Sequence, residues 1–201
     1  MIDPGHGGHD LGTTSTFDKS FHEKAVNLVT AQILQTHLQQ MGFRTLMTRQ
    51  SDVFVPLKKR SQFANDQNAD LYVSVHYNSA PAEKAHGIEV FYFNSEENKV
   101  RAAASKEMAK YVLDEVINKT AAKSRGVKHG NLAVIRETRM PAILIEGGFF
   151  TNEDEFNKIK DPAYLRKVAW GIAQGLRTYS ERKASLSQNT PNKKVSSKRN
   201  L

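Results

Sequence analysis

The amino-acid sequence predicts an α/β fold in a single domain. Short runs rich in β-branched and apolar residues alternate along the chain with longer segments of helical periodicity, and this alternation is typical of α/β proteins. The length of 201 residues suits one domain with a core of its own. Hydrophobic residues make up 39% of the chain and charged residues 25%, a balance that excludes an intrinsically disordered chain.

The strands are predicted from apolar runs bounded by glycine or polar residues. Ile2 and Asp3 are interpreted as the end of a buried strand, although only Met1 precedes them. The run Leu71-Tyr-Val-Ser-Val75 combines β-branched and aromatic residues and predicts a second strand. Further strands are predicted over residues 45–48, 87–93 and 142–145, with an edge strand over residues 132–135.

Helices are predicted where apolar residues recur every three or four positions. The first covers residues 23–41 and stops at Gly42, the second covers residues 56–68, and the third covers residues 96–118. The last begins with Asp161 as its cap and Pro162 as its first helical residue. The expected buried face of the third helix is Val100, Ala104, Met108, Val112 and Val116. The expected buried face of the last helix is Leu165, Val168, Ile172, Leu176 and Tyr179.

The net charge of +8 is distributed unevenly. Residues 180–201 carry six Arg and Lys residues against one acid and almost no large apolar side chain. We therefore expect a folded domain over residues 1–179 and a basic, disordered tail over residues 180–201. Such a tail is either simply solvated or forms a weak contact with an anionic polymer or lipid headgroups. The small charge excess of the domain gives no reason to expect a nucleic-acid partner.

Targeting segments are not evident in this chain. No apolar run of about 18 residues is present, so we expect no transmembrane segment. No basic segment with a following apolar run precedes Ile2, so we expect no signal peptide. The predicted first strand is short, which indicates a shortened chain or a misassigned start. On that interpretation the missing signal says nothing about the compartment.

Three polar side chains follow predicted strands at their C-terminal ends. His6 follows Ile2-Asp3 in a glycine-rich loop, His76 follows Val75 directly, and Glu146 closes the strand over residues 142–145. Because ligands bind beyond these ends in open α/β sheets, we expect the three to converge on one crevice. Taken singly, each has an alternative: a loop histidine, a hydrogen-bonded core histidine, and a carboxylate that bridges backbone amides in a turn.

Glu23 has two interpretations. Ser20-Phe-His-Glu23 matches a capping box, in which the glutamate bonds back to the cap amide, and the pattern alone favours this assignment. A metal ligand is the alternative. Because cysteine is absent, a metal would have to be held by His, Asp or Glu. A catalytic zinc takes three protein ligands and one water, with a second carboxylate to move the proton of that water. The candidates, two His and two Glu, match this requirement.

A set of motifs in a fixed order then identifies a resemblance. Ile-Asp-Pro-Gly-His-Gly-Gly at residues 2–8 resembles the opening motif of the zinc-dependent N-acetylmuramoyl-L-alanine amidases of the AmiC-like family. The resemblance covers about residues 2–179. The other matching motifs are Glu23-Lys-Ala-Val-Asn27, Thr48-Arg49, Arg60 with Ala64-Asn65, Ala69-Asp70, Ser74-Val-His-Tyr-Asn78, Gly87-Ile-Glu-Val90 and Met140-Pro-Ala-Ile-Leu-Ile-Glu146-Gly-Gly-Phe149.

The resemblance implies a fold and a set of ligands. It implies a mixed, mostly parallel twisted sheet with helices on both faces, in an amidase domain over residues 1–179. It implies that His6, Glu23 and His76 hold one Zn²⁺ per chain and that Glu146 is the catalytic acid/base. The assignment of Glu23 to a capping box is thereby reversed.

The resemblance also implies a substrate. This is the amide between the lactyl group of N-acetylmuramic acid and L-alanine of the peptidoglycan stem peptide, cut in cell-wall turnover or daughter-cell separation. We therefore expect an extracytoplasmic enzyme, in the periplasm or cell wall, and a monomer. Asn78 and Arg136 are expected to contact the substrate because they lie near the site loops. Residues 94–129 are too few for an inserted helix that plugs the site, so we expect activity without an activator protein.

Three other functions remain open at this point. One is a zinc carboxypeptidase that releases D-alanine from the stem peptide. Another is a serine penicillin-binding activity, because Ser180-Glu-Arg-Lys183 fits the S-x-x-K pattern and Lys128-His-Gly130 distantly matches K-T-G. The last is a wall-binding module without catalysis, although the presence of all the candidate site residues argues against it.

Overall fold

The computed structural model describes residues 1–82 and 84–188. Within them, a five-stranded sheet has the strand order β1-β2-β5-β3-β4. β1, β2 and β5 run parallel, β3 is antiparallel to β5, and β4 is parallel to β3. The expected mixed, mostly parallel sheet is therefore confirmed. The strands are β1 (Ile2–Pro4), β2 (Tyr72–Asn78), β3 (Ile88–Tyr92), β4 (Ser124–His129) and β5 (Ala142–Phe149).

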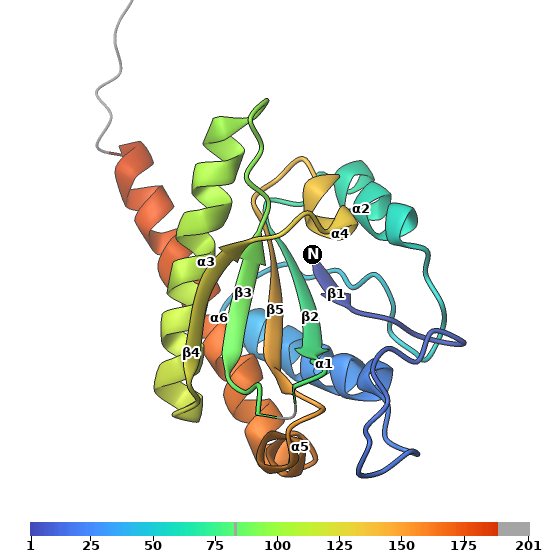
Figure 1. Cartoon of the computed structure of the whole chain (residues 1–201). Coiled ribbons are helices and arrows are strands. Elements are labelled where there is room, and N and C mark those ends of the chain that lie inside the picture. The colour runs from blue at the N-terminus through green and yellow to red at the C-terminus, as the bar shows by residue number, and fades with distance from the viewer. Residues whose placement is uncertain (83, 189–201) are drawn as a thin grey trace, which may run out of the picture.

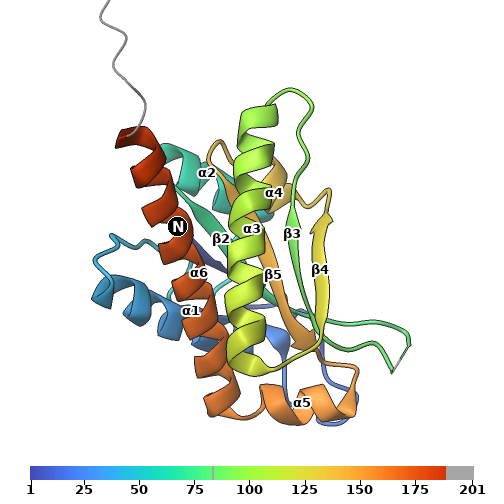
Figure 2. The ribbon, with the colours of Figure 1, turned by 90° about the vertical axis from the view of Figure 1, so that its left-hand side faces the viewer.

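Helices cover both faces of this sheet, as expected (Figure 1). The long helices α1, α3 and α6 pack on one face, and the short helices α2 and α4 pack on the other. Figure 2 shows α3 and α6 side by side along the covered face. The helices are α1 (Glu23–Gln40), α2 (Leu57–Asp66), α3 (Lys99–Thr120), α4 (Ala133–Arg136), α5 (Glu153–Ile159) and α6 (Pro162–Gln188).

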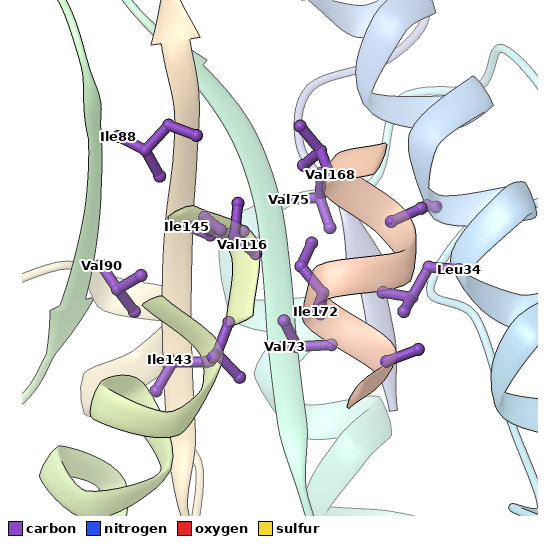
Figure 3. Close-up of a cluster of buried hydrophobic side chains, with 14 of the residues drawn as sticks. Leu34, Val73, Val75, Ile88, Val90, Val116, Ile143, Ile145, Val168 and Ile172 are labelled. Carbon is purple, nitrogen blue, oxygen red and sulfur yellow. The ribbon is translucent and has the colours of Figure 1, made fainter. Parts of the chain in front are cut away.

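Alternate residues of the central strands face two separate cores, because successive side chains of a strand point to opposite faces. Val73 and Ile143 belong to the larger core under α1, α3 and α6 (Figure 3). Tyr72 and Leu144 belong to the smaller core under α2 and α4. In Figure 1 these two helices lie over the upper part of the front face. The C-terminal ends of β2 and β5, which point downward in that view, are left without a helix in front of them.

The packing of α6 against α3 depends on two glycines. A Cβ atom at Gly175 would lie 2.4 Å from the Cα of Val112, and one at Gly171 would lie 2.6 Å from the Cα of Val116. The backbones of the two helices therefore approach so closely that no side chain fits between them at these points. This contact anchors the C-terminal helix to the layer that covers the sheet.

The last helix begins as predicted but ends later than predicted. Asp161 caps it by accepting a hydrogen bond from the backbone N of Ala163 at 2.8 Å, and the expected inner stripe is buried. The helix continues to Gln188, so the disordered tail expected from residue 180 is wrong for residues 180–188. This stretch lacks Gly and Pro, and the Arg177–Glu181 ion pair at 2.7 Å supports the helix across the expected boundary. Residues 189–201 of the expected tail lie outside the described residues.

Several predicted elements need correction. Residues 45–48 form no strand and contact β1 through a single bridge between Met47 and Ile2. Residues 132–135, predicted as an edge strand, contribute to helix α4, since a short apolar run fits either structure. β4 and α5 are absent from the prediction. Val100, expected on the buried face of the third helix, is 83% exposed, because the buried face of α3 begins with Arg101, Ala102 and Ser105.

Candidate metal centre

His6 lies in the loop after β1, in a backbone conformation that the glycine-rich sequence makes accessible. Its φ is +60°, a left-handed value that is uncommon for a residue with a side chain. Gly7 and Gly8 follow with φ of +129° and +59°. The ring Nδ1 of His6 lies 2.8 Å from Asp10 Oδ1, and Nε2 lies 3.3 Å from Glu23 Oε2. The loop therefore directs Nε2 of His6 toward Glu23.

His76 lies on β2, the neighbour of β1 in the sheet. Its ring packs on Gly5, where an added Cβ atom would lie 2.1 Å from His76 Cε1. The Nδ1 atom of His76 lies 3.0 Å from Glu23 Oε1. The rings of His6 and His76 have centroids 5.0 Å apart. The two imidazoles thus approach the same carboxylate, one from β2 and the other from the loop that follows the neighbouring strand β1.

Glu23 is the first residue of α1, and its buried carboxylate points to the histidines instead of to the helix cap. Oε2 accepts a hydrogen bond from Thr13 N at 2.9 Å, and Oε1 accepts one from Tyr77 N at 3.2 Å. Burial opposes ionisation, but the hydrogen bonds from His6 and His76 outweigh it and hold the pKa of Glu23 well below its ordinary value.

The capping box predicted from the sequence around Glu23 does not form. The cap residue of α1 is His22, which makes no side-chain cap bond. Ser20, the expected capping serine, donates its Oγ hydrogen to Asp18 Oδ1 at 2.6 Å. The pattern identified the start of the helix correctly, but the glutamate side chain has another partner.

One potential ligand atom from each of His6, Glu23 and His76 lies within 4.8 Å of the other two. The atoms that tetrahedral zinc binds lie roughly 3.4 Å apart, so small side-chain movements bring all three onto one ion. The structure therefore brings together the three residues for which the resemblance implied a metal.

Glu146 lies next to this cluster on β5, where it is the register partner of His76. Its Oε2 atom is buried and has no hydrogen-bond partner among the described residues, so that oxygen does not bridge turn amides. Burial, with the negative charges of Glu23 and Glu89 added, raises the pKa of the Glu146 carboxyl well above its ordinary value. A carboxyl with a perturbed pKa and an unpaired buried oxygen beside such a cluster is a candidate for proton transfer.

The two expected substrate contacts have protein partners in the structure. Asn78 Nδ2 donates to Glu89 Oε1 at 2.8 Å. Arg136, the last residue of α4, donates to Asn131 Oδ1 and Glu137 Oε1, both at 2.8 Å. Asn78 is thus hydrogen-bonded to Glu89, the strand neighbour of Glu146. The Arg136 side chain binds only residues close to it in the chain.

A cavity of about 400 Å³ lies over the cluster, between the loop after β1 and the start of α4. His6 and His76 form its polar floor, and Phe54, Leu57 and Leu132 contribute an apolar rim. A larger cavity of about 520 Å³ lies elsewhere, lined among others by Met1 and Tyr179. Of these two cavities, the smaller one is lined by the two histidines of the cluster.

The serine suggested by the S-x-x-K pattern lies at the larger cavity instead. Ser180 is a residue of α6, and its Oγ donates to Leu176 O at 2.9 Å. A helical serine with its hydroxyl bound to the preceding turn is not arranged as a nucleophile.

Three residues that support the site were missed by sequence reasoning. Asp10 orients His6 from four residues further along the same loop. Arg60 donates to the carbonyl oxygen of His6 at 2.7 Å, and Arg49 donates to that of Gly5 at 2.7 Å. Both arginines fall within motifs that carry the resemblance, but nothing in their spacing assigns them to the loop that carries His6.

An α/β fold that brings two imidazoles from its strand ends and a carboxylate from a helix start within 4.8 Å of one another defines a candidate metalloprotein. Within that class, the chain belongs to the N-acetylmuramoyl-L-alanine amidase family, whose model matches residues 1–178.

Relatives with known names support this membership. The chain is 32% identical over 179 residues to the probable cell wall amidase LytH of Staphylococcus saprophyticus, covering 89% of this chain and 57% of LytH. It is 33% identical over 179 residues to the N-acetylmuramoyl-L-alanine amidase LytC of Bacillus subtilis, covering 89% of this chain and 35% of LytC. The chain thus spans less than two thirds of the length of these relatives.

Solved structures agree with the fold. An N-acetylmuramoyl-L-alanine amidase from Clostridium difficile 630 has a TM-score of 0.84 and 37% identity, over 90% of this chain and 96% of that one. The catalytic domain of CwlV from Bacillus (Paenibacillus) polymyxa has a TM-score of 0.82 and 34% identity, over the same two fractions. Among the described residues, no helix is both long and apolar enough to cross a membrane.

Proposed function

We propose that this chain is a zinc-dependent N-acetylmuramoyl-L-alanine amidase. It hydrolyses the amide bond between the lactyl group of N-acetylmuramic acid and L-alanine of the peptidoglycan stem peptide. The observation that carries the proposal is the cluster of His6, Glu23 and His76 beside Glu146, whose buried Oε2 atom has no hydrogen-bond partner among the described residues. Membership of the amidase family supports the choice of bond.

The three clustered side chains would hold one zinc ion per chain. Two imidazoles and a carboxylate form a ligand set used by catalytic zinc, and they leave a position for water. When bound, zinc lowers the pKa of that water and polarises the carbonyl group under attack. Asp10 supports the fit because it binds Nδ1 of His6 and leaves Nε2 directed at the cluster. The amides of Thr13 and Tyr77 restrain the Glu23 carboxylate in the same way.

Glu146 would act as the acid/base. Its carboxylate takes a proton from the attacking water as oxygen bonds to the lactyl carbonyl carbon. It then gives that proton to the nitrogen of L-alanine as the C–N bond breaks, so the products are a lactyl carboxylate and a free amine. The position of Glu146 suits both steps, because it is the register partner of His76 and its Oε2 atom has no protein hydrogen-bond partner among the described residues.

The site would be open without a partner protein. The segment between β3 and β4, all of which is described, contains α3 and no second helix over the cluster. We therefore expect the chain to cleave peptidoglycan without an activator protein. If a pure and correctly folded chain, loaded with zinc, remains inactive until such a protein is added, this part of the proposal fails.

The remaining expectations follow from the substrate. Peptidoglycan lies outside the cytoplasmic membrane, so we propose that the enzyme acts in the periplasm or cell wall, in wall turnover or daughter-cell separation. We propose a monomer, since the candidate centre draws all of its side chains from one chain. The basic residues 180–201 would add a weak contact with an anionic polymer or lipid headgroups.

The test is mass spectrometry of muropeptides digested with the zinc-loaded chain. We expect stem peptides with a free L-alanine amine, and loss of this product when a chelator is added. Release of D-alanine would indicate a zinc carboxypeptidase. The variant Glu146→Gln should lose turnover and keep its zinc content. Full activity of this variant would make the acid/base assignment wrong, whereas an intact but inactive wild-type chain would favour a wall-binding module.

A further inference from the structure

A second polar cluster lies beside the candidate metal centre. Glu89 of β3 is the register partner of Glu146 on β5. Its Oε2 accepts hydrogen bonds from Arg125 Nε, at 2.8 Å, and from Lys128 Nζ, both on β4. Its Oε1 accepts the hydrogen bond from Asn78 Nδ2. The cluster therefore extends the row of polar side chains from Glu146 across β3 to the edge strand.

The two cations of this cluster are more exposed to solvent than the carboxylate that they bind. The Glu89 side chain is 5% exposed, whereas Arg125 is 30% and Lys128 40% exposed. Burial opposes ionisation of Glu89, but Lys128 and Arg125 lower its pKa, so the residue is a carboxylate. Counted against Glu89 alone, the two cations leave one positive charge in excess on the more exposed side of the cluster.

The donors of this surface are held in place and are only partly used. The Arg125 guanidinium stacks on the Phe149 ring at 4.8 Å, and its Nη1 donates to His86 O at 3.4 Å. Its Nη2 atom has no hydrogen-bond partner within the part of the chain that the structure describes. The Lys128 ammonium has three N–H donors, and Glu89 uses one. A carboxylate could thus be bound without breaking the existing bonds.

We propose that Arg125 and Lys128 bind a carboxylate of the stem peptide, the one carried by the residue that follows L-alanine. This inference rests on the proposed amidase function. β4 lies two strands from β5, or about 10 Å at the usual strand spacing. An extended peptide advances about 3.5 Å per residue, so the second residue reaches these long side chains when its scissile bond lies at Glu146. Asn78 is then a positioning residue that acts through Glu89.

The test compares two matched muropeptides, with a carboxylate or a carboxamide on the residue after L-alanine. We expect the wild-type chain to have a KM about 10-fold lower for the carboxylate form. Lys128→Gln should raise KM for that form toward the carboxamide value and leave kcat within about two-fold. Lys99→Gln, a change at an exposed lysine of α3, is the matched control and should keep the wild-type preference.

Binding of the free products gives a readout that needs no turnover. In titration calorimetry, the dipeptide L-alanyl-D-glutamate should bind wild-type protein more tightly than its carboxamide, and Lys128→Gln should remove the difference. Equal KM and equal binding for the two forms in the wild type would overturn the inference. Failure to cleave either muropeptide would instead count against the amidase proposal. The binding comparison does not depend on cleavage, so it still tests the carboxylate site in that case.

Discussion

Asp10 shows how a residue that is no metal ligand can determine metal affinity. It binds Nδ1 of His6 and also accepts the amide hydrogen of Gly12 at 3.1 Å, so it fixes both the ring and the loop. Removing such a partner of a ligating histidine costs about 10- to 100-fold in metal affinity. We expect this loss for Asp10→Ala.

The measurement for Asp10→Ala is zinc affinity by competition with a chromophoric chelator. Asp10→Asn should restore most of the affinity, because an amide oxygen still accepts from Nδ1–H. Asp114→Asn, a change at an exposed position of α3, should leave affinity unchanged. If Asp10→Ala bound zinc as tightly as the wild type, Asp10 would have no role in orienting His6.

A buried ion pair beneath the site makes stability depend on pH. Asp3 accepts from Arg60 Nη1 at 2.9 Å and from the hydroxyls of Thr48 and Ser74. Burial opposes ionisation of Asp3, but Arg60 and the hydroxyl donors outweigh it and lower its pKa. Because the folded pKa is depressed, the stabilising contribution is complete above the unfolded pKa of about 3.9 and is lost as pH falls through the folded value.

Asp3→Asn should therefore cost about 3–5 kcal/mol in free energy of unfolding at pH 7, since Arg60 keeps its charge and loses its buried partner. The difference from the wild type should shrink in acid, below about pH 4. Urea denaturation at pH 7 and pH 3 measures both values. A difference that stays constant over this range would show that the Asp3 carboxylate does not titrate with unfolding.

The places of His6, His76 and Glu146 could be predicted from the sequence, whereas the role proposed for Glu23 could not. His6, His76 and Glu146 follow apolar runs, so their place at strand ends could be derived from the sequence. Glu23 begins a helix, where a capping role was the simpler interpretation. Its partners lie 17 and 53 residues away in the chain, at His6 and His76, so local pattern could not reveal them.

At the scale of elements, α6 packs closely against α3 because glycines of α6 leave room for the backbone of α3. Gly175→Ala would place a methyl group 2.4 Å from the Val112 backbone. The gain in helix propensity from Gly to Ala is about 1 kcal/mol, whereas forced overpacking costs about 1–3 kcal/mol or more. Since the clash is with backbone and not with a flexible side chain, we expect net destabilisation, seen as a lower midpoint in urea.

An exposed helix position provides the control for Gly175→Ala. Lys167→Ala, on the outer side of α6, should change the free energy of unfolding by no more than about 0.5 kcal/mol. A variant Gly175→Ala as stable as the wild type would mean that α3 and α6 can move apart at little cost.

The sequence predicted those elements whose secondary structure follows from their own residues and not from a neighbouring element. The runs over residues 71–75 and 142–145 are central strands because β-branched and apolar side chains are buried on both faces. β4, with the sequence Ser-Arg-Gly-Val-Lys-His, is an edge strand whose polar residues give no alternation. It exists because β3 offers it an unpaired edge, which is a tertiary effect. α4 is likewise a tertiary result, since Val134 and Ile135 would fit a strand equally well.

For the whole molecule, zinc binding and folding should be linked. His6, Glu23 and His76 come together only in the folded chain, so the metal binds the native state and stabilises it. At free zinc 100-fold above Kd the gain is about 2.7 kcal/mol, or roughly 5–10 °C in Tm for a domain of this size. Calorimetry with zinc and with a chelator measures the shift.

Variants separate this linkage from nonspecific effects of the ion. Glu146→Gln should show the full zinc-dependent rise in Tm, because this residue is no proposed ligand. His76→Ala should show little or none. An equal rise in both variants would place the bound zinc somewhere other than at the proposed centre.

The position of β5 in the sheet has a consequence for the newly made chain. The three proposed ligands are all synthesised by residue 76, but β5 is the last strand to be made and lies between β2 and β3. Until it is inserted, β2 and β3 are not joined and Glu146 is missing. A nascent polypeptide still on the ribosome therefore has neither the joined sheet nor Glu146, and the lytic activity would begin only after nearly the whole domain had been translated.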